Sequence, residues 1–146
     1  MKRTLTILLL FFIAFNSHAQ ISPVYAPGAK AIGGYDPVAF FTETKPVMGK
    51  DSLSCNWNET AWYFSTETNR NLFLNDPEHY APQYGGYCAY GTSQGHKAPT
   101  KVETWSIVND KLYFNYNSKV KELWEKDKLA LIEKADKAWP EIKDKK

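Results

Sequence analysis

The two cysteines, Cys55 and Cys88, are the residues of this sequence that could take part in the widest range of reactions. A thiolate can attack an electrophile, bind a soft metal ion or form half of a disulfide. The chain alternates apolar and polar residues up to Cys55, while Cys88 leaves a glycine-rich loop that must approach the core. We therefore expect the two to lie close together. Three states stay open: a disulfide, a copper or zinc site, and two separate buried thiols.

Aromatic residues are the second candidate for function, because they make up 15% of the chain and gather in its middle. The pair Gly85-Gly86 stands between tyrosines and indicates that the backbone passes close to packed side chains or to a ligand. An aromatic cleft there would hold an apolar small molecule or a peptide, whereas the alternative is plain core packing. The predicted ligand-binding residues are Trp57, Tyr84, Tyr87, Tyr90 and Trp105.

No pattern in the sequence is typical of an enzyme. His79 and His96 are candidate additional ligands for a metal site, although a single exposed histidine is more often solvated than bound to a metal. The carboxylates show no paired spacing typical of acid–base catalysis. Ser93 has no partners typical of a catalytic triad, and the glycine-rich loop lacks the Lys-Ser/Thr of a phosphate loop. The sequence therefore predicts a protein that binds rather than catalyses.

The N-terminal segment has the features of a signal peptide over residues 1–19. Lys2 and Arg3 precede an apolar run, and Ser17 and Ala19 supply small residues before the predicted mature start at Gln20. The apolar run is too short to span a membrane. We expect an exported protein, periplasmic or extracellular, without stable membrane insertion once the signal is removed, in a compartment that oxidises thiols.

The net charge of the chain reduces the number of partner classes that the sequence allows. It has 18 basic and 16 acidic residues, and two of the basic ones lie in the predicted signal peptide. The mature protein is therefore formally neutral. Nucleic acids and anionic membranes select a positive surface, so we expect neither as a partner. A small ligand or a metal ion is the predicted partner.

These residues must be positioned by a small α+β fold. Period-two patterns predict antiparallel hairpins over 53–64 and 105–116, and period-3.6 patterns predict helices over 66–74 and 118–138, with a bend near Asp127. We expect an exposed lead-in over 20–30, one domain over 31–140 and a charged tail over 141–146, without an internal repeat. The predicted core residues are Trp57, Trp62, Phe64, Phe73, Tyr87 and Trp105.

Residues 32–38, 62–65 and 81–89, with Phe73, Pro77 and Tyr80, resemble the YHS family, in particular its exported single-domain bacterial members. The resemblance implies a fold related to treble-clef metal-binding domains. It also implies that cysteine ligands would stand at the positions of Ala39, Ser65 and Asn69, none of which supplies a thiolate.

Three functions follow from the residues and the resemblance together. The first is a small exported binding protein associated with copper or zinc, using Cys88 and Cys55. The second is a non-catalytic module that binds a ligand through its aromatic cleft, without a metal. The third is an uncharacterised enzyme.

Overall fold

The computed structural model describes residues 22–145, so the predicted signal peptide lies outside the described residues. Its elements in chain order are η1 (Pro27–Ala29), η2 (Ala31–Gly34), α1 (Ala39–Thr42), β1 (Lys50–Trp57), β2 (Thr60–Phe64), α2 (Glu67–Asn75), α3 (Pro77–Tyr80), η3 (Gln83–Gly86), α4 (Ala89–Ser93), β3 (Lys101–Val108), β4 (Lys111–Asn115), α5 (Ser118–Glu125) and α6 (Lys128–Ile142).

The strands form two separate antiparallel hairpins, β1 with β2 and β3 with β4. Each hairpin closes with a two-residue turn in which both residues have positive φ, at 58–59 in the first and 109–110 in the second. Asparagine opens both turns, and it tolerates this left-handed conformation better than most residues. The predicted α+β class, with two hairpins and a C-terminal helical segment, is confirmed.

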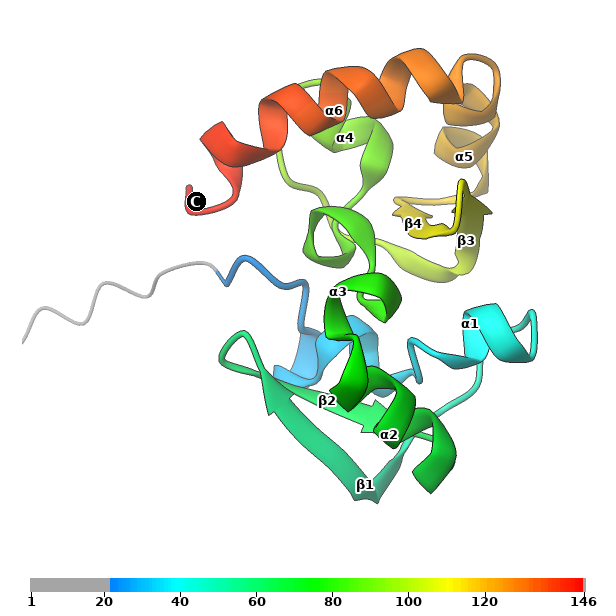
Figure 1. The fold of residues 1–146 in the computed structure, drawn as a ribbon. Helices are drawn as coiled ribbons and strands as arrows, with labels where there is room; N and C mark the ends of the chain where they lie inside the picture. The colour runs from blue at the N-terminus through cyan, green and yellow to red at the C-terminus, as the bar shows by residue number, and fades with distance from the viewer. Residues whose placement is uncertain (1–21, 146) are drawn as a thin grey trace, which may run out of the picture.

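The two hairpins belong to two units of the same plan, which lie below and above α3 in Figure 1. Each unit has a Gly-Gly turn, a short helix, a hairpin and a capped helix, in that order. The Gly-Gly turns share one backbone conformation: φ and ψ are 44° and 37° at Ile32 and 55° and 35° at Tyr84, and 68° and 18° at Gly33 and 61° and 15° at Gly85. The helices that follow the hairpins are N-capped by the side chains of Thr66 and Asn117.

The structure therefore repeats one plan of elements, although no internal repeat was expected from the sequence. The two units share few residue types apart from the Gly-Gly-Tyr turn and the asparagine of the hairpin. The second unit also has an extra helix, α6, whereas the connection between the short helix and the hairpin has seven residues in both units, 43–49 and 94–100. The two units share backbone conformation at the turns and caps, where few residue types fit, while their packed side chains differ.

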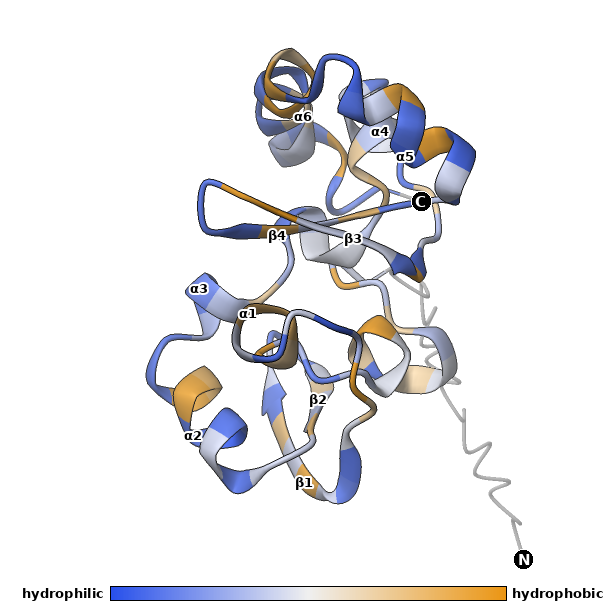
Figure 2. Ribbon diagram, turned by 90° about the vertical axis from the view of Figure 1, so that its right-hand side faces the viewer, coloured by the Kyte–Doolittle hydropathy of each residue, from blue (hydrophilic) through white to orange (hydrophobic). Residues whose placement is uncertain are grey.

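The C-terminal helical segment is divided where the sequence predicts a bend. α5 ends at Glu125 and α6 starts at Lys128, because Asp127 has the non-helical φ of −147°. Along both helices apolar and polar residues alternate (Figure 2), as expected for helices with one packed face. α6 continues beyond the predicted end at 138 into the predicted charged tail, where Ile142 is buried.

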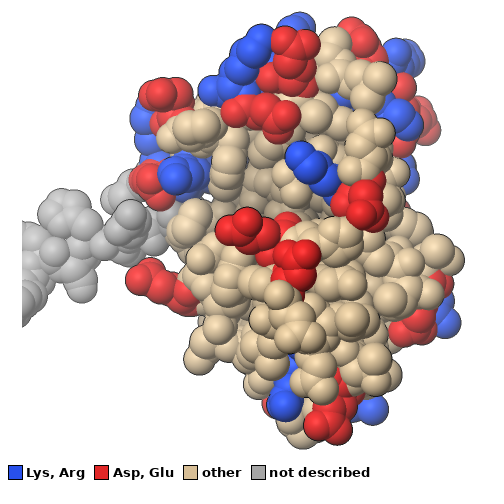
Figure 3. All heavy atoms as spheres, viewed as in Figure 1, with Lys and Arg blue, Asp and Glu red and all other residues tan. Residues whose placement is uncertain are grey.

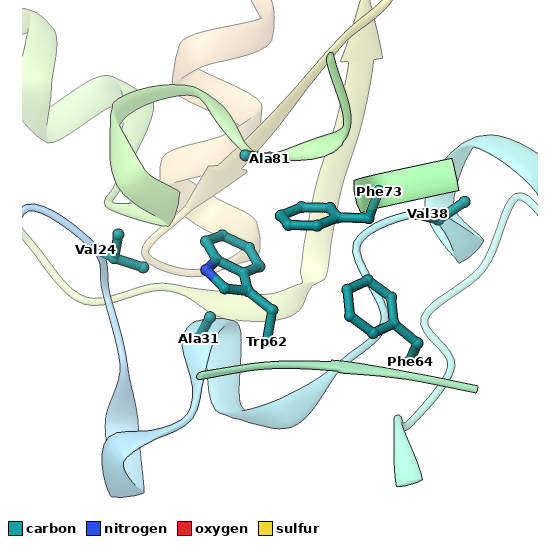
Figure 4. Close-up of a cluster of buried hydrophobic side chains, with 7 residues drawn as sticks. All are labelled: Val24, Ala31, Val38, Trp62, Phe64, Phe73 and Ala81. Carbon is teal, nitrogen blue, oxygen red and sulfur yellow. The ribbon is translucent and has the colours of Figure 1, made fainter. Parts of the chain in front are cut away.

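The core of the first unit is built around Trp62, Phe64 and Phe73 (Figure 4), which the sequence places correctly in the interior. The predicted core residues Trp57 and Trp105 are only partly buried. Val24 also packs in the first core and is only 4% exposed, so the lead-in predicted to be exposed over 20–30 is partly buried. The second unit has a core of its own around Trp124, and a third cluster contains Phe40 and Phe114.

Within residues 22–145, no helix combines the length and the apolar character needed to cross a membrane.

Candidate functional site

The structure does not bring the two cysteines together. Both are free; Cys55 lies on β1 of the first unit, whereas Cys88 directly precedes α4 of the second (Figure 1). Burial raises the pKa of both thiols. At Cys55 the positive charge of Arg70 lowers the pKa, but by less than burial raises it. A raised pKa keeps a thiol in its less reactive, protonated form.

The candidate histidines do not complete a metal site. His79 packs against Phe41 and Tyr80, with its Nδ1 3.6 Å from a carboxylate oxygen of Asp110. His96 is exposed. Among the described residues, no group of three or more His, Cys, Asp or Glu side chains is placed to hold a metal ion.

The positions at which the YHS resemblance implies metal ligands converge on the buried carboxylate of Asp36. Oδ1 accepts hydrogen bonds from the amides of Val38 at 2.9 Å and Ala39 at 3.3 Å. Oδ2 accepts from the amide and the hydroxyl of Ser65, at 2.8 and 2.7 Å, and from Nδ2 of Asn69 at 2.8 Å. These five donors saturate the carboxylate, so its oxygens have no free direction for a metal ion. The residues here do not fit a metal.

Cys88 occupies the position in the second unit that is equivalent to the position of Asp36 in the first. Each residue follows a Gly-Gly-Tyr turn, and its side chain accepts a hydrogen bond from an amide in the first turn of the short helix that comes next, Ala39 for Asp36 and Gly91 for Cys88. The Cys88 sulfur accepts from the amide of Gly91 at 3.4 Å, and the amides of Tyr90 and Tyr116 also favour its thiolate, although less than burial disfavours it. Cys88 is only 1% exposed, so its sulfur acts as a cap in the protein interior. Sequence reasoning missed this equivalence, for which the repeated Gly-Gly-Tyr was the available signal.

A groove of about 610 Å³ lies between the two units. Its aromatic lining residues are Trp57, Trp62, Tyr84 and Trp139. Its ionisable lining residues are Glu59, Glu78, Asp136, Lys143, Asp144 and Tyr84. Several acidic side chains surround the hollow between the upper and lower halves (Figure 3). We call this cavity the inter-unit groove.

Each aromatic wall of the inter-unit groove is fixed by its own unit. In the first unit, the end of the β1–β2 hairpin presents Trp57 and Trp62, whose rings meet edge to face at 5.7 Å. The indole nitrogen of Trp62 donates to the carbonyl of Trp57 at 3.0 Å and holds this arrangement. In the second unit, the ring of Tyr84 lies 6.0 Å from that of Trp139 on α6. Aromatic walls thus face the cavity from both units.

Tyr84 is held by a hydrogen bond at the edge of the inter-unit groove. Its hydroxyl donates to the Asp136 carboxylate at 2.8 Å. Burial, reinforced by this hydrogen bond, strongly raises the pKa of Tyr84, so the phenol stays protonated. The positive φ of Tyr84 is not by itself a sign of function, because Ile32 has the same strained conformation at the equivalent turn.

The five aromatic residues predicted from the sequence do not form a single cleft. Trp57 and Tyr84 line the inter-unit groove. Tyr87 packs against Tyr25 and Trp139 and lines a different cavity, of about 380 Å³. Tyr90 packs on the core of the second unit, and Trp105 on the ring of Phe40. Trp62, which sequence reasoning placed both in the core and near the aromatic cleft, also lines the groove, as does Trp139, which it interpreted only as a helix-face residue.

Comparisons with protein-family models, with curated proteins and with solved structures found no match for this chain. Membership of the YHS family stays a prediction from the sequence.

Proposed function

We propose that this protein is a non-catalytic binding module whose inter-unit groove holds a small organic ligand with a flat apolar body. The observation that carries the proposal is the groove itself, a cavity of about 610 Å³ with aromatic rings from both units. Ligand sites are typically clefts of roughly 300–1,000 Å³ lined by aromatic and apolar side chains with a few polar groups. The inter-unit groove has this size, and its four aromatic side chains stand beside a larger number of polar and ionisable ones.

The geometry supports this function better than the copper or zinc association predicted for Cys55 and Cys88. The two thiols lie in different units, and the buried Cys88 sulfur serves as a helix cap. The predicted relation to YHS proteins is compatible with the proposal. Ala39, Ser65 and Asn69, where the resemblance implies metal ligands, all donate hydrogen bonds to the buried Asp36 carboxylate, which lies where a metal would be expected. Export by the predicted signal peptide would place such a module outside the cytoplasm.

The experiment is an NMR titration of the protein with 2-phenylethanol, a neutral aromatic probe, in two tryptophan variants. Trp139→Ala removes a wall of the inter-unit groove. Trp105→Ala is the matched control, because this residue is likewise half-buried in the second unit but lies outside the groove. We expect probe-induced shifts at the groove residues of the wild type and of Trp105→Ala, and weaker binding to Trp139→Ala.

Backbone amide spectra of both variants establish that each is folded. Equal affinities of the two variants, or no binding by the wild type to either a neutral or a charged aromatic probe, would refute the proposed function.

A further inference from the structure

We infer that the ligand of the inter-unit groove is an organic cation, a compound with an aromatic or apolar body and a protonated amine or a comparable positive group. This inference rests on the proposed function and names the ligand class. It is carried by charge: the mature protein is formally neutral by its sequence, whereas the groove is not.

Four carboxylates and one ammonium group line the groove. The acidic residues are Glu59, Glu78, Asp136 and Asp144, and Lys143 is the basic one. None of these five side chains forms a salt bridge within residues 22–145. The lining therefore has a formal charge of about −3. Lys97, which donates to the Lys143 carbonyl at 2.9 Å and interacts electrostatically with Asp144, offsets part of this charge, and a cation entering the groove would neutralise more of it.

The carboxylates come from separate parts of the chain and meet only because the two units pack together. Glu59 lies in the turn of the β1–β2 hairpin, and Glu78 in α3. Asp136 belongs to α6, and Asp144 follows it. Both Glu59 and Asp136 are exposed to solvent. Acidic groups thus flank the cavity from the first unit, from α3 and from the second unit.

The aromatic walls select for the same class of ligand. The face of a tryptophan or tyrosine ring carries negative electrostatic potential, which attracts a cation within about 6 Å of the ring centre. Trp57, Tyr84 and Trp139 are placed around the cavity, and Tyr84 is kept neutral by the pKa rise described above. An anionic ligand would meet both the carboxylates and these ring faces unfavourably.

The test compares three probes of one shape: phenethylamine, which is cationic, 2-phenylethanol, which is neutral, and phenylacetate, which is anionic. We expect phenethylamine to bind about fivefold or more tightly than the alcohol at low ionic strength, and phenylacetate to bind least. The advantage of the amine should shrink in 0.5 M NaCl, since salt screens exposed charges.

A charge-removing variant locates the effect. Glu59→Gln with Glu78→Gln removes two lining charges and should weaken phenethylamine binding about fivefold without changing the affinity for the alcohol. Glu103→Gln with Glu122→Gln is the matched control, because both residues are exposed and neither lines the groove. We expect this control to bind like the wild type.

The outcomes separate the two proposals. If the alcohol binds as tightly as the amine, or phenylacetate binds more tightly than either, the cation inference is wrong while the aromatic site stands. If both double variants weaken amine binding equally, the effect comes from net charge and the inference is also wrong. If none of the three probes binds, the proposed function fails and the inference with it.

Discussion

Replacing Asp36 with asparagine tests the finding that a saturated carboxylate occupies the centre of the first unit. Asparagine has the same shape, but one of its terminal atoms donates instead of accepting. If the amide nitrogen takes the position of Oδ2, the amide of Ser65 and Nδ2 of Asn69 lose their acceptor, while the Ser65 hydroxyl can rotate to accept. If it takes the position of Oδ1, the amides of Val38 and Ala39 lose theirs.

The first orientation leaves the buried Ser65 amide without a partner and Asn69 Nδ2 with only its 3.4 Å hydrogen bond to the Ser65 hydroxyl, and the second leaves two buried amides without a partner. A buried unsatisfied donor costs about 1–3 kcal/mol, so the variant, with one or two such donors, should lose about 1–6 kcal/mol of unfolding free energy. That is a large part of the roughly 5–15 kcal/mol typical of a natural domain. We expect the urea midpoint of Asp36→Asn to fall accordingly.

Asp51→Asn is the matched control for this measurement. Asp51 is 84% exposed and pairs with Lys30 at the surface, where such a pair contributes about 0–1 kcal/mol. We therefore expect nearly unchanged stability for the control. A loss below about 1 kcal/mol in Asp36→Asn, or a loss equal to that of Asp51→Asn, would refute the proposed network, since even one orphaned buried donor costs at least about 1 kcal/mol.

Four further changes test other parts of the structure. Phe73→Ala should cost about 3–5 kcal/mol in urea unfolding, because the ring is fully buried, and an unchanged midpoint would show it exposed. Gly85→Ala should destabilise much more than Gly95→Ala: both have positive φ, but only at Gly85 would a Cβ fall 1.8 Å from a backbone oxygen, and equal losses would contradict the close approach. Burial raises the pKa of Tyr113 to about 12, so its phenolate absorbance should appear above the usual pH 10 and stability should fall as pH rises from 10 to 12; normal titration would contradict this. Thiol titration of the native protein should leave Cys88 unreacted until denaturant is added, and a rapid reaction of both thiols would contradict its burial.

Local structure was predictable where it depends on neighbouring residues. The hairpins and the interruption at Asp127 follow from alternation, from helical spacing and from the conformations that turn residues tolerate. The α+β class follows from the same patterns. Trp62, Phe64 and Phe73 were correctly placed in the core because large apolar residues of a half-buried strand or an amphipathic helix face inward.

The inter-unit groove was not predictable, because it depends on how the two units pack. Glu59 and Asp136 are far apart in sequence, and no local pattern shows that both border one cavity. The repeat was missed because its two turns share only Gly-Gly-Tyr. The expectation that Cys55 and Cys88 lie close together assumed that the strand of Cys55 and the loop of Cys88 face one common core. Each unit instead has a core of its own.

The indole signals of the five tryptophans test the central claim most directly, because they report on the inter-unit groove and on the rest of the protein in one spectrum. Trp57, Trp62 and Trp139 line the groove, while Trp105 and Trp124 do not. When phenethylamine is titrated into the ¹⁵N-labelled protein, the account predicts saturable shifts of the first three indole signals and stationary signals for the other two. Shifts confined to Trp105 or Trp124, or five signals that all stay in place, would contradict it.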